Sequence, residues 1–389
     1  MTRAAIPDDP DLRAVLAALP EARLVGGAVR DILLGLKVND FDLATPRPPQ
    51  EVISALRRAG LKAVPTGLAH GTVTAVANHR GFEVTTLRRD VATDGRHATV
   101  AFTDDWREDA ARRDFTINAM SMDQDGTIFD YFGGQEDLRA GRLRFVGDPA
   151  ARIAEDYLRI LRYFRFWARY GRSPPDDETR AALRGGVPGL ARLSVERIWS
   201  ELSRLLALPD PVQALALMAE LDVLAAILPE GTSAPRLAAL VAANAPADPI
   251  LRLAALLDGD ATALATRLRL SNQERDTLIA LRGTPIPRPE LDDDALRRLL
   301  ADIPAYILIG RAWLAGGANP GWPELRARLA ALPRPVFALE GRDALALGIP
   351  SGPAVGTLLR DVRDWWLAGG CIADAETCRA ELRRRAALT

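Results

Sequence analysis

Two aspartates, Asp40 and Asp42, are separated by the single residue Phe41 and follow a pair of glycines by about a dozen residues. In a β-strand, residues i and i+2 face the same side, so this spacing predicts two carboxylates side by side. Two like charges held this close repel each other unless a cation lies between them. Paired carboxylate oxygens suit Mg²⁺ that also carries a substrate phosphate. The segment therefore predicts a metal site for phosphoryl chemistry.

Two further segments carry groups that suit a nucleotide. Glu83 lies in "GFEVTTLR", an alternating segment that we expect as a strand beside "DFDLAT", where Glu83 would offer a third carboxylate. "RRDFTINAM" places Arg112, Arg113 and Asp114 close to Asn118. Guanidinium groups suit a triphosphate, and carboxylate and amide oxygens suit a ribose hydroxyl.

A row of charged side chains follows in "EDYLRILRYFRF", where Asp156, Arg159, Arg162 and Arg165 are spaced three residues apart. On a helix this spacing predicts a slowly drifting polar row. The alternative is an ordinary solvent-facing surface with i,i+3 pairs, of which Asp156 with Arg159 would be one. No histidine follows His97, which leaves little scope for a histidine-based metal site.

The elements that must position these groups change character along the chain. Up to residue 145, short apolar strands alternate with helices, and "HRG" indicates a hairpin between two of the strands. From residue 146 onward, helical periods are separated by breaks rich in Gly and Pro, such as "GRSPPDDE" and "GTPIPRPE". The sequence therefore predicts an α/β head followed by a long helical remainder.

Length, hydrophobic content and cysteine spacing indicate a globular protein of more than one domain. The chain has 389 residues and is 48% hydrophobic, which is enough for two or three packed domains. No apolar run reaches the roughly 18 residues of a membrane span, and the first residues lack the apolar core of a secretion signal. The two cysteines, Cys371 and Cys378, match no zinc spacing. We therefore expect a cytoplasmic protein with no membrane partner.

The order of the motifs resembles a known family. "GGAVRD" with "DFD", then "RRDFTINAM", "FDYFGGQEDL" and "EDYLRILR" are similar to the successive motifs of class II tRNA nucleotidyltransferases and bacterial poly(A) polymerases. These enzymes belong to the polymerase β nucleotidyltransferase superfamily. The resemblance implies a polymerase β-like catalytic head with a mixed sheet over residues 1–145. It further implies an all-helical neck that recognises the base over residues 146–205, and a helical body and tail that bind tRNA over residues 206–389.

The resemblance also implies roles for individual residues. Asp40 and Asp42 would bind the catalytic Mg²⁺, and Asp42 or Glu83 would act as base for the RNA 3′-hydroxyl. Asp156 and Arg159, taken as an ion pair, would read the edge that C and A share. The full set of nucleotide-binding residues implied in this way is Gly27, Arg30, Arg113, Asp114, Asn118, Asp156, Arg159, Arg162 and Arg165.

The expected activity is the addition of C, C and A from CTP and ATP to the 3′ end of tRNA. The segment after the first motif lacks the basic element typical of bacterial poly(A) polymerases, and the lack of late histidines excludes an HD phosphohydrolase domain. The alternatives are an A-adding or CC-adding tRNA enzyme, a poly(A) polymerase, a small-molecule nucleotidyltransferase, and a non-catalytic RNA-binding homologue. Paired carboxylates speak against a pure RNA binder, because they repel an RNA backbone.

The segment from Arg88 to Phe102 is expected to be a loop, because it is too polar for a core and carries Asp94-Gly95 as a turn. By resemblance it matches a flexible loop whose motion helps the family change from C to A addition.

Overall fold

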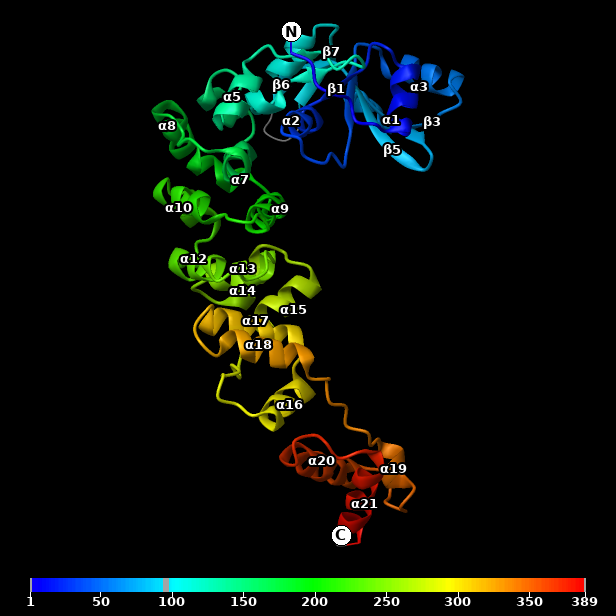
Figure 1. The fold of residues 1–389 in the computed structure, drawn as a ribbon, viewed down its shortest axis with the longest axis vertical. Helices are drawn as coiled ribbons and strands as arrows, with labels where there is room; N and C mark the ends of the chain where they lie inside the picture. Colours follow the sequence, from blue (N-terminus) through cyan, green and yellow to red (C-terminus); the bar gives the residue numbers. More distant parts are fainter. Residues whose placement is uncertain (1, 94–97, 388–389) are drawn as a thin grey trace. The chain divides into compact units, whose positions relative to one another are not determined.

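The structure is a computed structural model that describes residues 2–93 and 98–387. It divides into two compact units, residues 1–229 and residues 230–389. All the strands of the main sheet lie in the first unit, as the blue and cyan arrows show (Figure 1). The finer division at residues 145 and 205 stays a prediction.

The head contains a seven-stranded mixed sheet with the strand order β3-β4-β5-β2-β1-β8-β9. Only β2 and β5 run parallel, and every other neighbouring pair is antiparallel. The mixed sheet expected from the sequence is confirmed. Its strands are β1 (Arg23–Val25), β2 (Asp42–Thr45), β3 (Lys62–Gly67), β4 (Thr72–Ala77), β5 (Arg80–Thr86), β8 (Ser121–Met122) and β9 (Ile128–Phe129).

Local sequence explains the strands that surround the site. In β4, Val73, Ala75 and Ala77 are buried and alternate with more exposed threonine and valine positions, which is the pattern of a strand with one face in the core. The predicted hairpin joins β4 to β5, and its two turn residues are Asn78 and His79. Both have positive φ, at 45° and 68°, as a two-residue turn between strands with right-handed twist requires.

The helices of the head cover the sheet and connect its strands. α1 and α3 contact β4 and β5, whereas α2 lies between β1 and the 3₁₀ turn η2. α3 begins with Pro49 in its first turn, where the missing N–H is not needed. The bounds are α1 (Pro10–Ala18), α2 (Gly27–Leu33), α3 (Pro49–Arg58), η1 (Leu68–His70), α4 (Trp106–Ala111), η2 (Thr116–Asn118) and α5 (Gly134–Ala140).

The segment expected as a loop from Arg88 to Phe102 is instead a separate two-stranded antiparallel ribbon. β6 (Arg88–Thr93) pairs with β7 (Ala98–Phe102), with Arg88 opposite Phe102. The prediction was wrong because the two arms, "RRDVAT" and "ATVAF", satisfy their backbone hydrogen bonds by pairing with each other, which needs no burial in a core. The expected turn at Asp94-Gly95 lies outside the described residues.

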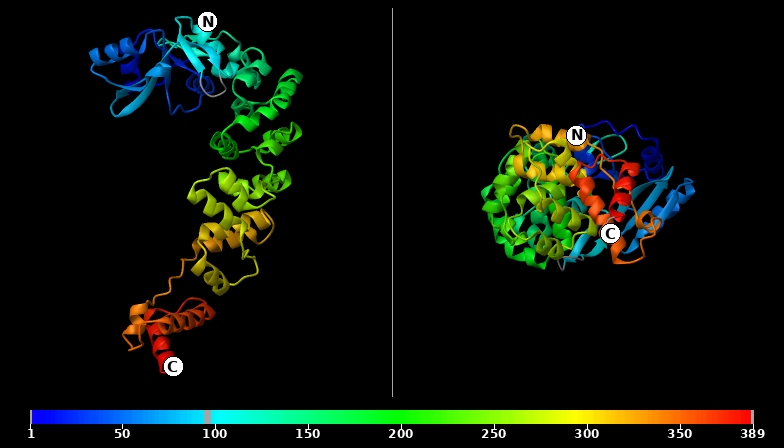
Figure 2. Two further views of the ribbon diagram at one scale, coloured as in Figure 1. Left: turned by 180° about the vertical axis from the view of Figure 1, so that it is seen from behind. Right: turned by 90° about the horizontal axis from the view of Figure 1, so that it is seen from below.

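Beyond the sheet, the first unit is helical. In the part of the chain that the structure describes, no strand follows Phe129, in agreement with the sequence (Figure 2). These elements are α6 (Pro149–Glu155), α7 (Leu158–Tyr170), α8 (Asp177–Gly185), η3 (Val187–Arg192), α9 (Val195–Leu206), α10 (Val212–Glu220) and α11 (Val223–Ile227).

The second unit consists of helices with their own apolar cores. One core is formed around Leu296, Leu308 and Leu325, and another around Val362, Trp366 and Cys378. Its helices are α12 (Ala234–Ala242), α13 (Pro249–Leu256), α14 (Ala261–Arg267), α15 (Asn272–Arg282), α16 (Asp293–Asp302), α17 (Ala305–Gly316), α18 (Trp322–Ala331), α19 (Gly341–Leu345), α20 (Pro353–Ala368) and α21 (Ala375–Ala386).

No single helix among the described residues has both the length and the apolar composition to cross a membrane. The pair α16 and α17 meets these criteria only when the two helices are taken together, across a bend of 117°.

Candidate active site

The two aspartates that opened the sequence analysis lie at the start of the central strand. Asp42 is the first residue of β2, and Asp40 precedes it. Both are exposed, whereas Phe41 between them is buried. On the neighbouring parallel strand β5, Glu83 lies directly opposite Asp42. Within residues 2–93 and 98–387, no three His, Cys, Asp or Glu side chains are arranged to hold a metal, so the third-ligand role of Glu83 stays a prediction.

The electrostatic setting of Asp42 fits a divalent cation. Partial desolvation of its carboxylate raises its pKa, the Arg113 guanidinium opposes this, and the charge of Asp40 raises the pKa further, so that it lies above its usual value. A cation bound by both carboxylates removes the repulsion between them. Mg²⁺ is commonly held by one or two carboxylates while substrate phosphates complete its coordination, and Asp40 with Asp42 supply this donor set.

A glycine turn lies next to the aspartates. Gly26 has a φ of 68°, and a Cβ atom at this position would lie 2.9 Å from Nη1 of Arg113. A side chain would therefore push the Arg113 guanidinium away. The following residue, Gly27, begins α2, and a Cβ atom there would lie 3.4 Å from Nη2 of Arg30. The two glycines thus let two guanidinium groups approach the backbone at the start of α2.

The Arg30 side chain is almost entirely buried, with 6% of its surface exposed. Its Nε donates to Asp31 at 2.9 Å and its Nη1 donates to Oδ1 of Asn118 at 2.6 Å. The guanidinium also stacks on the ring of Tyr170, 4.3 Å from its centroid. Two of its three nitrogens are thus engaged by the protein, and a contact of the third with a nucleotide phosphate stays a prediction.

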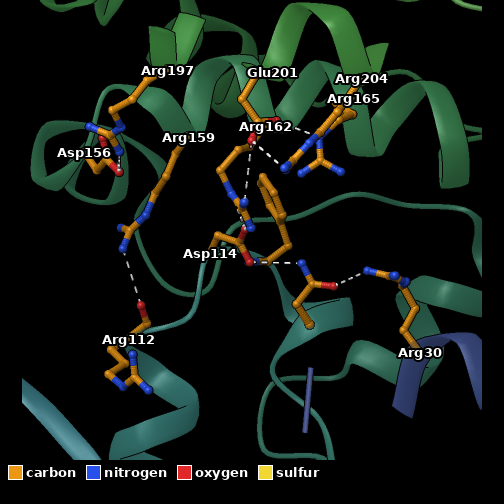
Figure 3. A network of polar contacts seen from close by, with 12 residues as sticks. Arg30, Arg112, Asp114, Asp156, Arg159, Arg162, Arg165, Arg197, Glu201 and Arg204 are labelled. Carbon is orange, nitrogen blue, oxygen red and sulfur yellow. Dashed lines mark hydrogen bonds and ion pairs between the residues drawn. The ribbon is translucent and has the colours of Figure 1, made fainter. Parts of the chain in front are cut away.

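Asp114 lies at the centre of a buried polar network (Figure 3), and Asn118 is bonded to it. Oδ2 of Asp114 accepts hydrogen bonds from Nε and Nη2 of Arg162 at 2.9 and 2.5 Å. Its Oδ1 accepts from Nδ2 of Asn118 at 3.0 Å, and Asn118 in turn accepts from Arg30. Burial raises the pKa of Asp114, but Arg162 and the hydrogen bonds outweigh it, so this pKa lies below its usual value. Asp114 is therefore an ionised carboxylate that joins the head to α7.

The row from Asp156 to Arg165 does not lie on one helix, contrary to the sequence prediction. α6 ends at Glu155, and Asp156 has extended backbone with φ −154° and ψ 106°. The Asp156 carboxylate accepts a hydrogen bond from the N–H of Leu158, where α7 begins. An aspartate that binds an unsatisfied N–H at a helix start favours a break there, which three-residue spacing cannot reveal.

The expected ion pair between Asp156 and Arg159 is also wrong. Asp156 accepts from Arg197 of α9 at 2.7 Å. Arg159 contacts Glu155 at 2.5 Å and donates to the backbone carbonyl of Arg112 at 3.4 Å (Figure 3). The break at Asp156 places its carboxylate at the start of α7, where it binds the N–H of Leu158 and Arg197 of α9, so each member of the expected pair has another partner.

Glu201 on α9 is a buried carboxylate of the candidate site that the sequence analysis missed. It is 3% exposed, accepts from Nε of Arg165 at 2.6 Å, and has Nη1 of Arg162 within 3.8 Å. Arg162 therefore lies between two carboxylates, Asp114 before η2 and Glu201 of α9 (Figure 3). A signal was present: Glu201 interrupts the buried apolar stripe of α9 at a position where a charged residue needs a partner.

Taken together, the site joins an exposed carboxylate pair to a set of arginines that extends through Asp114 into α7. Carboxylates beside guanidinium groups have the chemistry that a metal-bound triphosphate requires. Fold and site define a nucleotidyltransferase with a polymerase-type head.

Comparison with known proteins agrees. Residues 22–144 match the family described as "Poly A polymerase head domain", and residues 175–234 match "Probable RNA and SrmB- binding site of polymerase A". The human mitochondrial CCA tRNA nucleotidyltransferase 1 is 37% identical over 90% of this chain and 83% of its own length. The CCA-adding enzyme of Geobacillus thermodenitrificans is 36% identical over 86% of each chain.

A solved structure is also similar to this chain over almost its whole length. The crystal structure of the Bacillus stearothermophilus CCA-adding enzyme in complex with CTP matches with a TM-score of 0.79 and 29% identity, over 99% of both chains. The chain belongs to the family of CCA-adding tRNA nucleotidyltransferases.

Proposed function

We propose that this enzyme adds C, C and A in turn to the 3′ end of tRNA, using CTP and ATP as substrates and Mg²⁺ as cofactor. The observation that supports the proposal is the position of Arg113. Its charge acts on Asp42, which Asp40 also affects, and it directly precedes Asp114, which binds Arg162 of α7. The names of relatives that are 36–37% identical over most of the chain support CCA addition over poly(A) synthesis.

The reaction forms a bond between the RNA 3′-oxygen and the α-phosphorus of the nucleotide, and it breaks the bond to the β-phosphate. Pyrophosphate leaves, and the hydroxyl proton moves to a carboxylate, for which Asp42 and Glu83 are the candidates. Asp40 and Asp42 would hold Mg²⁺, which would supply charge neutralisation at the reacting phosphate. Arg113 then contacts the triphosphate, and Gly27 and Arg30 line the same end of the site.

In this proposal the sugar of the nucleotide contacts Asp114 and Asn118, and the base contacts residues at the start of α7. Asp114 and Asn118 accept and donate hydrogen bonds at the position that we assign to the ribose, and Arg162 and Arg165 bind phosphate or base from α7. Asp156 and Arg159 read the base. C and A both present an amine donor beside a ring-nitrogen acceptor, which matches one carboxylate and one guanidinium, whereas U and G present the opposite order.

The contacts of Asp156 and Arg159 support a modified form of this proposal. Because Asp156 is held by Arg197 and Arg159 by Glu155, the two reading groups are fixed by separate partners and not by each other. Each is therefore oriented before the nucleotide arrives, which reduces the entropy cost of ordering it on binding.

The proposal is tested with tRNA transcripts that end either at the discriminator base or after CC. We expect CTP alone to extend the first by two residues, and ATP alone to extend the second by one. Extension of the first transcript by ATP alone into long tails would indicate a poly(A) polymerase. An enzyme that performs only one of the two steps would be an A-adding or CC-adding enzyme, and RNA binding without extension would indicate a non-catalytic homologue.

The cytoplasmic location stays a prediction.

A further inference from the structure

Asp109 is a buried carboxylate to which none of the functional motifs assigns a role. It lies on α4, is 3% exposed, and accepts hydrogen bonds from two consecutive arginines. Nε of Arg112 donates to its Oδ1 at 2.9 Å, and Nη2 of Arg113 contacts its Oδ2 at 3.3 Å. The Asp109 carboxylate therefore lies between the two guanidinium groups that precede Asp114.

The spacing explains how one short side chain holds both arginines. Arg112 and Arg113 lie three and four residues after Asp109, so their side chains lie on the same face at the end of α4. Burial raises the pKa of Asp109, but the charges of Arg113 and Arg112 outweigh it, so this pKa lies below its usual value. An ionised Asp109 offsets the repulsion between two adjacent cations that are themselves only about one-fifth exposed.

Arg113 and Arg112 contact different parts of the candidate site. The Arg113 guanidinium lies close to the turn at Gly26. Its positive charge opposes the rise in the pKa of Asp42, so Arg113 lies on the side of the carboxylates to which we assign the metal. The Arg112 carbonyl accepts from Nη2 of Arg159, on the side where we place base recognition. Asp109 therefore binds two consecutive residues, one of which lies close to the Gly26 turn and the other of which contacts Arg159 through its backbone.

Asp109 also binds the base of the ribbon formed by β6 and β7. Its Oδ1 accepts the backbone N–H of Arg88, the first residue of β6, at 3.3 Å. The ribbon and the arginine pair are thus attached to one carboxylate. Leu87 directly precedes β6 and Thr103 directly follows β7. The N–H of Thr103 donates to the carbonyl of Leu87, and this hydrogen bond joins the two arms at the base of the ribbon.

We propose that Asp109 is a positioning residue for nucleotide binding, which orients Arg112 and Arg113 so that Arg113 meets the incoming triphosphate. Asp109 does not touch the substrate itself. The proposal rests on the assignment of Arg113 to the nucleotide under the proposed function.

The test compares Asp109→Asn with the matched control Glu108→Gln. Glu108 lies on the same helix and contacts Thr103 and Arg89, not the arginine pair. For the full-length protein with Mg²⁺, we expect Asp109→Asn to raise the Kd for CTP and the KM for both nucleotides about tenfold, the loss typical of one misplaced charged contact. The control should bind CTP as the wild type does. A lower kcat at unchanged KM would indicate only a loss of folded enzyme and would overturn the proposal.

A double-variant comparison separates positioning from general stability. If Asp109 acts through Arg113, then Asp109→Asn combined with Arg113→Gln should bind CTP no more weakly than Arg113→Gln alone. Additive losses would contradict the proposal. Asp109→Glu keeps the charge, so it should fall between wild type and Asp109→Asn, and it provides the same comparison if Asp109→Asn does not fold.

CTP binding is measured by equilibrium dialysis without RNA, so the result does not depend on tRNA extension. A wild type that binds CTP but does not extend tRNA would contradict the proposed function and leave the Asp109 comparison intact. A wild type that extends tRNA, with Asp109→Asn binding CTP normally, would contradict the role of Asp109 alone.

Discussion

Arg162 donates two hydrogen bonds to a single carboxylate oxygen of Asp114, from Nε at 2.9 Å and from Nη2 at 2.5 Å, across 48 residues of sequence. Asp114 lies between α4 and η2 of the head and Arg162 on α7, so this contact connects the head with the helix that we assign to the base. Its burial makes it a structural contact as well as a candidate part of the site.

Removing one member of this pair should destabilise the enzyme. Arg162→Ala leaves the buried Asp114 charge without its main partner, which typically costs about 3 kcal/mol. Asp114→Asn costs less, because an amide still accepts one hydrogen bond and Arg162 remains about one-third exposed to water. Chemical denaturation of the first unit should show this order. Equal stability of Arg162→Ala and the wild type would contradict the structural role of the pair.

The pH dependence of stability should reflect the lowered pKa of Asp114. A carboxyl whose folded pKa lies below its unfolded value of about 3.9 contributes stability that is present above that pH and is lost as the pH falls through the folded value. The melting-temperature difference between wild type and Asp114→Asn should therefore be constant above pH about 5 and shrink below pH about 4. The exposed Asp104→Asn variant is the control. A difference that grows towards low pH would contradict the assigned direction.

Replacing either metal-binding carboxylate should abolish catalysis. Asp40→Ala and Asp42→Ala each remove half of the donor set for Mg²⁺, so nucleotide addition should fall to background while tRNA affinity, measured by filter binding, changes little. Glu51→Gln removes an exposed carboxylate from α3 of the same head and serves as the control. Near-normal turnover by either aspartate variant would contradict the metal assignment.

Base selection should weaken when Asp156 or Arg159 is replaced by Ala. A buried mismatch costs about 1–3 kcal/mol per unpaired group, so loss of one reading group should raise misincorporation of UTP or GTP about tenfold relative to CTP and ATP. Arg169→Ala, at the exposed end of α7, is the control. Equal slowing with all four nucleotides would mean that the two residues support the site but do not read the base.

Several features of the fold followed from local sequence. The alternation in β4 and the glycine turn before α2 are set by side-chain periodicity and by short-range backbone preferences. The expected pairing of the Glu83 strand with the Asp42 strand is confirmed, but it is a contact between distant parts of the sequence. The alternation around Phe41 predicted two carboxylates on the same side of the segment, and in the structure both are exposed while Phe41 is buried.

The contact partners of the charged side chains could not be predicted from local sequence. Asp156 to Arg159 is a favourable spacing on any helix, and only the hydrogen bond to Leu158 reveals that a new helix starts there. The contact of Glu201 with Arg165 joins two helices 36 residues apart, which depends on tertiary packing. Local spacing identifies which side chains are charged, and tertiary packing decides which of them meet.

The most direct test of the account is the mass of the product when tRNA ending at the discriminator base is incubated with the enzyme, Mg²⁺ and all four nucleotides. The account predicts one product, longer than the substrate by two C residues and one A, with no U or G incorporated and no further growth. A ladder of A residues, incorporation of all four bases, or an unchanged mass would contradict it.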